Sequence, residues 1–328
     1  MVRFLITGGA GFIGSHLAEA LLARGDLVTI IDNLSTGRFE NVQHLVPNPH
    51  FSFAIADIAN EIVLDRLASQ CDILVHLAAT VGVDLVVRSP VQTILTNVDG
   101  TEVVLRTARR YRAKTLIASS SEVYGKGARV PFHEDDDVLL GPTCRARWAY
   151  AASKMVDEFL GMAYHHEFGL QVVPFRLFNT VGPRQVGRYG MVMPRFVSAA
   201  LAGKTLQVYG DGMQVRCFCH VRDVVRAIIA LAEEPIAVGQ VFNVGSTDPI
   251  SILDLARRII ALTHSASDIV FVPYDQAYAK GFEDMARRIP DTTRIQQTVG
   301  WEPQFSLDDI ILDVAHWLKE TGVAPGIL

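Results

Sequence analysis

The sequence is poor in the features that mark metal-binding, disulfide-linked and membrane proteins. Its 328 residues include only four cysteines, and positions 71, 144, 217 and 219 show no spacing typical of a zinc site or a disulfide framework. The ten histidines are scattered and do not complete a metal set. No apolar run approaches the roughly 18 residues that cross a bilayer, and the opening residues lack a signal peptide's features. We therefore expect a cytoplasmic protein with reduced thiols, no metal and no membrane contact.

A strong net charge is also absent. The formal charge is −5, and 20% of the residues are charged against 49% that are hydrophobic. This balance is typical of globular proteins and offers no electrostatic reason to bind nucleic acid. A small molecule is therefore the expected partner.

Short apolar runs alternate with amphipathic segments through the first half of the chain. "RFLITG", "LVTIID", "ILVHLAA" and "TLIASSS" are too apolar to face water, and helical patterns separate them. This alternation predicts a parallel sheet covered on both faces, an α/β doubly wound fold. We place a large domain at residues 1–178, with returning segments near 217–246. A smaller, interleaved α/β lobe, mainly at 179–328, is expected to bind substrate.

A glycine motif follows the first expected strand. Gly8, Gly11 and Gly14 stand in the pattern G-x-x-G-x-x-G, where a tight turn opens a helix whose N-terminus stabilises a pyrophosphate. Asp32 ends the second strand 18 residues later, where a carboxylate accepts hydrogen bonds from an adenosine ribose. The pattern predicts a Rossmann fold that binds NAD. The alternatives are a turn that serves packing alone, and NADP if Arg38 binds a 2′-phosphate.

A hydroxyl cluster and a tyrosine–lysine pair form the expected catalytic centre. Ser120, Ser121 and Glu122 end a strand at the rim of the crevice where ligands of such sheets bind. Tyr150 and Lys154 lie four residues apart, on one face of a helix. We expect the lysine ammonium and an oxidised nicotinamide to lower the tyrosine pKa, so that the phenolate takes a proton. Taken alone, a Tyr-x-x-x-Lys pair is usually an exposed helix face.

In these segments the chain resembles the extended short-chain dehydrogenases/reductases, in the group of NAD-dependent nucleotide-sugar epimerases, dehydratases and decarboxylases. The matching stretches are "TGGAGFIGSHL", "DNLSTG", "ADI", "HLAA", "NVDGT", "SSSEVYG", "YAASK", "RLFNTVGPRQ", "VYGDGMQVRCFCHVRDVV" and "GWEP". The resemblance implies catalytic roles for Ser120, Glu122, Tyr150 and Lys154. It implies that the cofactor contacts are Gly8, Gly11, Phe12, Ile13, Gly14, Asp32, Asn33, Ser35, Thr36, Gly37, Asp57, Ile58, Leu77, Ala78, Ala79, Asn97, Tyr150, Lys154 and Phe178.

The same resemblance implies a site for a nucleotide sugar. Asn179, Arg216 and Arg288 match positions that bind the substrate diphosphate, a task suited to arginine. The implied substrate contacts are Ser120, Ser121, Asn179, Gln207, Val208, Tyr209, Arg216 and Arg288. Taken alone, each arginine is better explained as a surface residue, and Tyr209 is equally well explained as a core aromatic. The helices at 100–112 and 150–168 match a dimer interface of the group, so a homodimer is expected by analogy.

The group shares a first step, oxidation of the sugar at C4, and its members differ in the fate of the resulting 4-keto sugar. We favour a 4-epimerase acting on a UDP-hexose or UDP-hexuronate through a 4-keto intermediate. The first alternative is a UDP-glucuronate decarboxylase, which Glu122 and the segment "GPTCRARWAYAASK" resemble. A GDP-mannose-type 4,6-dehydratase ranks third, and Ser121 stands where dTDP-glucose dehydratases carry aspartate. The non-enzyme alternative is an NAD-binding regulator, and Glu122 has the alternative of pairing with an arginine without touching substrate.

Overall fold

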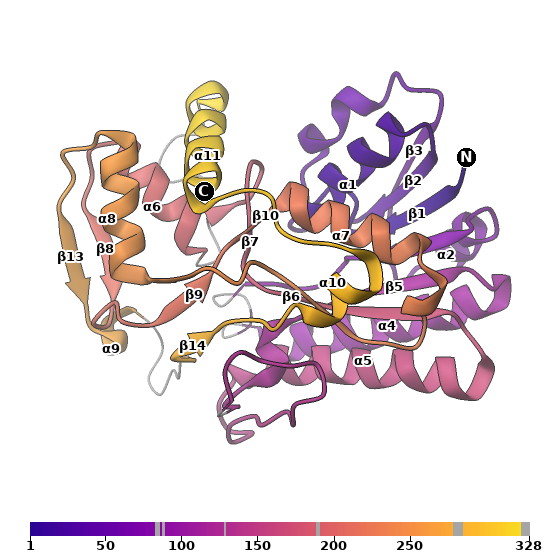
Figure 1. The fold of residues 1–328 in the computed structure, drawn as a ribbon. Helices are drawn as coiled ribbons and strands as arrows, with labels where there is room; N and C mark the ends of the chain where they lie inside the picture. The colour runs from indigo at the N-terminus through magenta and orange to yellow at the C-terminus, as the bar shows by residue number, and fades with distance from the viewer. Residues whose placement is uncertain (83–85, 87–88, 128, 188–190, 278–284, 323–328) are drawn as a thin grey trace.

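The computed structural model describes residues 1–82, 86, 89–127, 129–187, 191–277 and 285–322, and its centre is a seven-stranded sheet (Figure 1). All its strand pairs are parallel. In spatial order the strands are β11 (Phe242–Val244), β6 (Val172–Leu177), β5 (Lys114–Ser120), β4 (Ile73–His76), β1 (Arg3–Thr7), β2 (Leu27–Asp32) and β3 (Phe51–Ile55). The inner strands are buried along nearly their whole length, as expected of a sheet covered on both faces.

Helices cover both faces of this sheet and bury two separate apolar clusters. On one face lie α1 (Phe12–Ala23), α7 (Val221–Glu233) and α10 (Thr293–Val299). On the other lie α2 (Glu61–Ala68), α4 (Pro90–Tyr111) and α5 (Trp148–Phe168). Figure 1 shows α4 and α5 side by side, on the side of the sheet opposite to α7. The predicted doubly wound α/β fold is confirmed.

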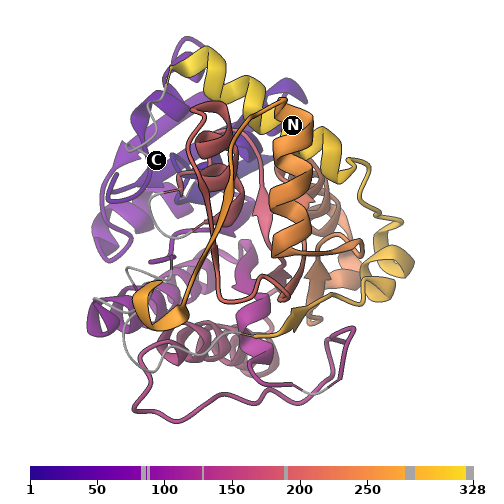
Figure 2. The ribbon, with the colours of Figure 1, turned by 90° about the vertical axis from the view of Figure 1, so that its left-hand side faces the viewer.

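A smaller lobe packs beside the carboxyl ends of the strands (Figures 1 and 2). Its own core joins α6 (Val192–Leu201), β8 (Leu206–Tyr209), α8 (Ile252–Thr263), β13 (Ile269–Val272) and α11 (Leu307–Thr321). Ser306 and Asp309 form a capping box that fixes the start of α11. A three-stranded sheet and a strand pair connect lobe and sheet: β12 (Pro249–Ser251), β9 (Val215–Cys217), β14 (Arg287–Arg288), β10 (Cys219–His220) and β7 (Thr180–Val181).

The chain crosses between the two parts more often than the predicted boundaries imply. The segment near 217–246 carries α7 and β11, which lie against the large sheet. Residues 293–301 fall within the predicted lobe, yet Ile295 and Trp301 pack in the core under α1 and α7. The remaining short elements are η1 (Phe39–Asn41), η2 (Gln43–Leu45), η3 (Ser121–Tyr124), η5 (Pro235–Ala237) and α9 (Tyr274–Ala277).

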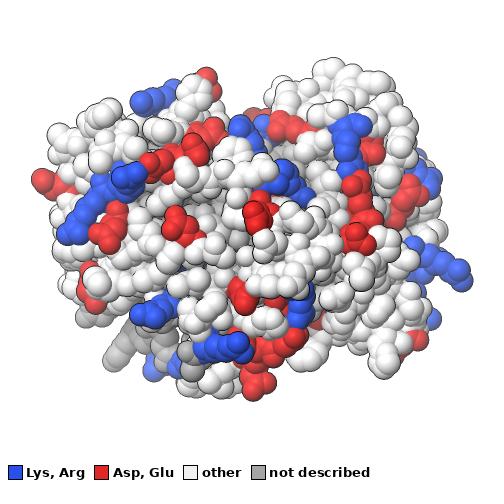
Figure 3. Space-filling model, viewed as in Figure 1, with Lys and Arg blue, Asp and Glu red and all other residues white. Residues whose placement is uncertain are grey.

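The surface agrees with the weak net charge. Over the described residues on the face drawn in Figure 3, basic and acidic side chains are interspersed rather than gathered by sign. Within the described part of the chain, no helix has both the length and the hydrophobicity needed to cross a bilayer.

Candidate active site

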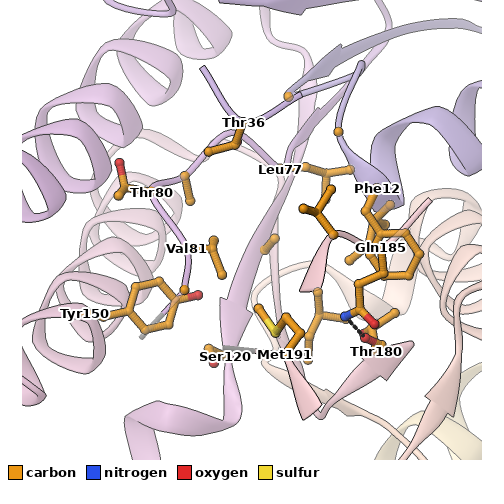
Figure 4. A pocket seen from close by; sticks show the side chains of 18 of the residues that line it. Phe12, Thr36, Leu77, Thr80, Val81, Ser120, Tyr150, Thr180, Gln185 and Met191 are labelled. Atoms are coloured by element: carbon orange, nitrogen blue, oxygen red, sulfur yellow. Dashed lines mark hydrogen bonds between the residues drawn. The ribbon is translucent and has the colours of Figure 1, made fainter. Parts of the chain in front are cut away.

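A cavity of about 490 Å³ lies where the carboxyl ends of the strands meet the smaller lobe. Each central strand contributes a residue at or just beyond its end: Gly8 after β1, Asp32 on β2, Leu77 after β4, Ser120 on β5 and Leu177 on β6. Ligands of doubly wound sheets bind at this edge because the strand ends leave backbone and side-chain polar groups unused there. In Figure 4, Tyr150 and Ser120 point into the cavity from one side, and Gln185 and Thr180 lie across it.

The glycine turn leaves room for a pyrophosphate. Gly8 has φ +69°, and a Cβ there would lie 2.8 Å from the Ala78 nitrogen. A Cβ on Gly14 would overlap the Gly8 carbonyl. The helix α1 starts after Gly11 without a side-chain cap, so its first N–H groups are available to an anion. These observations fit a bound dinucleotide phosphate.

Asp32 is oriented as an acceptor at the other end of this half of the cavity. Its Oδ2 accepts from the Ala10 N–H at 2.9 Å and its Oδ1 from the Leu34 N–H at 2.8 Å. Burial raises the pKa of the Asp32 carboxyl, and these backbone donors lower it. Asn33 donates to Asp57 at 2.8 Å, which ties the ends of β2 and β3 together beside it. The arrangement fits a ribose and an adenine.

Most predicted cofactor residues line this half of the cavity, and three lie behind it. The lining members are Gly8, Gly11, Phe12, Ile13, Gly14, Asp32, Asn33, Ser35, Thr36, Asp57, Ile58, Leu77, Ala78, Ala79, Tyr150 and Lys154. Gly37 backs Asp32, where a Cβ would lie 2.8 Å from the carboxylate oxygens. Asn97 is buried and braces the site, accepting from the Thr80 N–H at 2.8 Å and donating to Ser153 at 2.9 Å. Phe178 is wholly buried in an apolar cluster with Tyr124.

Tyr150 and Lys154 stand one turn apart on α5, beside the end of β5. Burial, and secondly the Glu122 carboxylate, raise the pKa of Tyr150, while the Ser120 hydroxyl lowers it. In the protein without cofactor, the pKa of Tyr150 is therefore raised, and the lowering that we expected from Lys154 is not seen. The Lys154 ammonium instead donates to Asp157 at 2.7 Å, and that carboxylate offsets its charge.

Glu122 lies in a cluster of arginines. Its Oε1 is 2.5 Å from Arg288 and its Oε2 is 2.6 Å from Arg147. Burial alone would raise the pKa of Glu122, but Arg288 and Arg147 lower it to about 2. Arg288 also donates to Asn179 at 3.1 Å, and it is the register partner of Arg216 on the neighbouring strand. Glu122 therefore pairs with arginines and also faces the cavity.

The predicted substrate residues divide in the same way. Ser120, Ser121, Asn179, Tyr209, Arg216 and Arg288 line the cavity. The other two lie away from it: Gln207 is exposed, and Val208 is buried in the core of the lobe. Because side chains alternate along β8, Val208 points away from the side that carries Tyr209.

Sequence reasoning missed several lining residues, including Arg147, Thr80, Gln185 and Arg195. Arg147 stands three residues before Tyr150, where neither spacing nor periodicity marks a partner for Glu122. The Arg195 guanidinium lies 4.1 Å from the centre of the Tyr209 ring. Gln185 belongs to the stretch "RLFNTVGPRQ", and the resemblance of that stretch to the family was the one signal that could have found it.

The described cysteines and acidic residues form neither a disulfide nor a metal-binding group. All four cysteines are free, with Cys144 exposed and the other three buried. Across the residues whose placement is described, no group of three or more metal-binding side chains occurs.

Comparison with known proteins places these features in one family. The family model of GDP-mannose 4,6 dehydratase matches residues 5–314. UDP-N-acetyl-alpha-D-glucosaminuronate decarboxylase of Bacillus cytotoxicus is 44% identical, over 97% of this chain and 98% of its own. UDP-glucuronic acid decarboxylase 1 of Xenopus tropicalis is 36% identical, over 97% of this chain and 72% of its own.

Among solved structures, UDP-glucuronic acid 4-epimerase of Bacillus cereus, in complex with UDP-glucuronic acid and NAD, superposes with a TM-score of 0.87. It is 28% identical and covers 97% of this chain and 99% of its own. This likeness agrees with the predicted cofactor, NAD. The chain thus belongs to the GDP-mannose 4,6 dehydratase family, within the extended short-chain dehydrogenases/reductases of nucleotide sugars.

Proposed function

We propose that the protein is an NAD-dependent decarboxylase of a UDP-linked hexuronate. The observation that carries the proposal is Glu122, held as an anion between Arg147 and Arg288 beside Tyr150. The relative with 44% identity is a decarboxylase of this substrate class. The epimerase favoured from the sequence is not confirmed, and the decarboxylase alternative has the better support.

The cofactor half of the cavity supplies the contacts that NAD needs. The N-terminus of α1 would hold the pyrophosphate, Asp32 a ribose, and Asp57 with Ile58 the adenine. Bound NAD would accept a hydride from C4 of the sugar and later return it.

In the first step, the protein must remove a proton from the C4 hydroxyl of the sugar. Tyr150 takes this proton as phenolate, and the Ser120 hydroxyl orients the substrate oxygen toward it. Because burial and Glu122 raise the pKa of Tyr150 in the protein alone, the phenolate depends on cations brought close to it. Lys154 and, with NAD bound, the nicotinamide would supply those cations.

The second step is loss of carbon dioxide. A ketone at C4 makes the carboxylate on C5 a β-keto acid, and the bonding electrons move to the C4 oxygen as CO₂ leaves. Ser120 and the protonated Tyr150 donate to that oxygen and stabilise its charge. Glu122 stays ionised at neutral pH, so it is a poor proton donor, and C5 takes its proton from water. Dehydration must protonate a leaving hydroxyl, and the ionised Glu122 is poorly suited to that task.

Anion-binding residues complete the proposal on the substrate side. Arg216 is buried beside Arg288, and Asn179 faces the same space. We assign these three side chains to the diphosphate and the sugar carboxylate, since guanidinium groups bind both in pairs of hydrogen bonds. Tyr209, stacked on Arg195, would face the uracil.

A 4-epimerase remains the second candidate because of its fold likeness. The Bacillus cereus enzyme binds a hexuronate substrate on the same fold, and it is named an epimerase rather than a decarboxylase. The two reactions share Tyr150, Ser120 and Lys154 and diverge after oxidation. Glu122 with its two arginines is the feature that we assign to the decarboxylase outcome.

We also propose a homodimer formed by α4 and α5. Apolar side chains are exposed on both helices, with Ile94 and Leu95 on α4 and Val156 and Phe159 on α5. An exposed apolar surface shared by two packed helices is typical of an interface, and a second copy is the occupant that the resemblance implies.

The test is to incubate the protein together with NAD in three separate reactions, with UDP-glucuronate, UDP-N-acetylglucosaminuronate or UDP-glucose as substrate. We expect carbon dioxide and a UDP-pentose product from a hexuronate, detected by mass spectrometry and NMR. An unchanged mass with an inverted C4 centre identifies the epimerase, and loss of water identifies a dehydratase. Tyr150→Phe is the control, and it should abolish turnover while NAD still binds.

A further inference from the structure

A buried ion pair lies directly beside the proposed base. Lys154 Nζ donates to Asp157 Oδ2 at 2.7 Å, three residues further along α5. The two side chains are 3% and 0% exposed. The carboxylate is therefore a permanent neighbour of the one ammonium that the proposed reaction uses.

Stability does not explain this pair. Burying two charges costs as much as their attraction returns, and an apolar pair of similar volume is often as stable. The second oxygen, Asp157 Oδ1, is buried. Burial raises the pKa of this carboxyl, and the Thr101 hydroxyl of α4, which also lies against His76 Nε2, is the neutral group that lowers it. A carboxylate kept in the interior with so few partners costs free energy, so a role in the site is the better explanation.

The charges around Asp157 leave Lys154 as its cationic partner. On α5 itself, Glu158 is paired with Arg176 at 2.8 Å. From β4, His76 faces Lys154 and lies between two threonine hydroxyls at 2.7 and 3.0 Å. Burial, and secondly Lys154, lower the pKa of His76 to about 3, so this ring is neutral.

The charges around Tyr150 come from three elements. Glu122 from η3 and Asp157 from α5 raise the pKa of the phenol, and Arg288 from β14 lowers it. Glu122 has two arginine partners, whereas the cationic partner of Asp157 is Lys154. The phenol thus lies beside an ammonium whose charge is largely balanced.

We propose that Asp157 is a positioning residue: it holds the Lys154 ammonium in place and offsets the charge that this ammonium presents to Tyr150. Asp157 thereby sets the pH at which the tyrosine becomes a base. The inference rests on Tyr150 being the base of the proposed function. It does not depend on which sugar is oxidised.

The test removes the charge and keeps the shape. In Asp157→Asn, loss of the carboxylate leaves the ammonium unbalanced, so the Tyr150 phenol should ionise about one pH unit lower. Ultraviolet difference titration against the same protein carrying Tyr150→Phe isolates this phenol from the other tyrosines. The acid limb of kcat/KM should move to lower pH by the same amount, with KM for the UDP-hexuronate unchanged.

Three further variants keep the result interpretable. Glu167→Gln removes an equal charge from an exposed position on α5 and should move neither titration. Asp157→Glu restores the charge and should return the acid limb to its original position. If Asp157→Asn does not fold, Asp157→Ser carries the same expectation.

Two results would overturn the inference. One is a folded variant whose Tyr150 titration does not move. The other is a move to higher pH, which would mean that Asp157 keeps Lys154 protonated rather than offsetting it. Full activity of Tyr150→Phe would instead reject the proposed base, and that result is independent of Asp157.

Discussion

The two ends of the cavity recognise their ligands by different physical means. At the cofactor end, most of the contacts come from residues 8–79, and Tyr150 and Lys154 join them from α5. The helix N-terminus and the Gly8 turn act through N–H groups and space. At the sugar end, Glu122, Arg147 and Arg288 come from three distant segments and meet through charge.

This difference decides how each end responds to change. Backbone groups do not titrate, so the glycine turn should tolerate a wide pH range and fail when its space is filled. The sugar end should keep its shape after a substitution of equal size and fail when a charge is lost. The two ends can therefore be broken separately.

The largest effect is expected from filling the glycine turn. Gly14→Ala places a methyl group against the Gly8 carbonyl and the Gly9 Cα. Overpacking of this kind costs about 3 kcal/mol, or roughly a hundredfold in NAD affinity. Calorimetric titration with NAD measures the loss, and UDP should still bind to the protein. Unchanged NAD affinity would mean that this turn is not the pyrophosphate site.

At the other end, removal of one charge should lower carbon dioxide release without weakening NAD binding. Glu122→Gln leaves Arg147 and Arg288 free to reorient, and a misplaced substrate costs roughly tenfold to a hundredfold in carbon dioxide release. NAD binding should stay as in the unsubstituted protein, because Glu122 lies at the sugar end. Release of carbon dioxide and NAD affinity are measured on the same samples. An equal loss of both would contradict separate ends.

The same residue predicts a pH dependence of stability confined to the sugar end. The folded pKa of Glu122 is about 2, against an ordinary value of 4.5. Its stabilisation, about 3 kcal/mol, is complete above pH 4.5 and is lost as the pH falls toward 2. Urea unfolding should therefore show Glu122→Gln less stable at pH 7, with the difference shrinking below about pH 4.5. A constant difference would mean that the arginines do not hold this carboxylate.

The smallest effect is expected at Gln207, and it tests where the substrate site ends on β8. Gln207 is exposed on β8 and does not line the cavity, although its neighbour Tyr209 does. Gln207→Ala should change KM by less than about twofold, as surface substitutions usually do. Steady-state kinetics should compare the KM of Gln207→Ala with that of Arg216→Ala, which should be clearly raised. A large effect of Gln207→Ala would extend the substrate site onto β8.

The predicted site residues that rest on local patterns lie together in the structure. The glycine turn, Asp32 and the Tyr150–Lys154 spacing are local patterns, and all of them line the cavity. Two other predicted contacts lie away from the cavity. Val208 packs in the core of the lobe, because alternation along β8 turns it away from the side that carries Tyr209. Phe178, directly after β6, lies in an apolar cluster. The segment around Trp301 likewise joined the large core, which no composition change marks.

The amino-acid sequence by itself determined the parallel sheet, the dinucleotide turn and the order of the catalytic groups, because each depends on residues a few positions apart. Only the tertiary structure decided the charges around those groups. Arg147 and Arg288 reach Glu122 from separate parts of the chain, and the packing around α5 buries the ion pair of Lys154 and Asp157. Ionisation depends on burial and on partners brought together in space, and these exist only once the chain is folded.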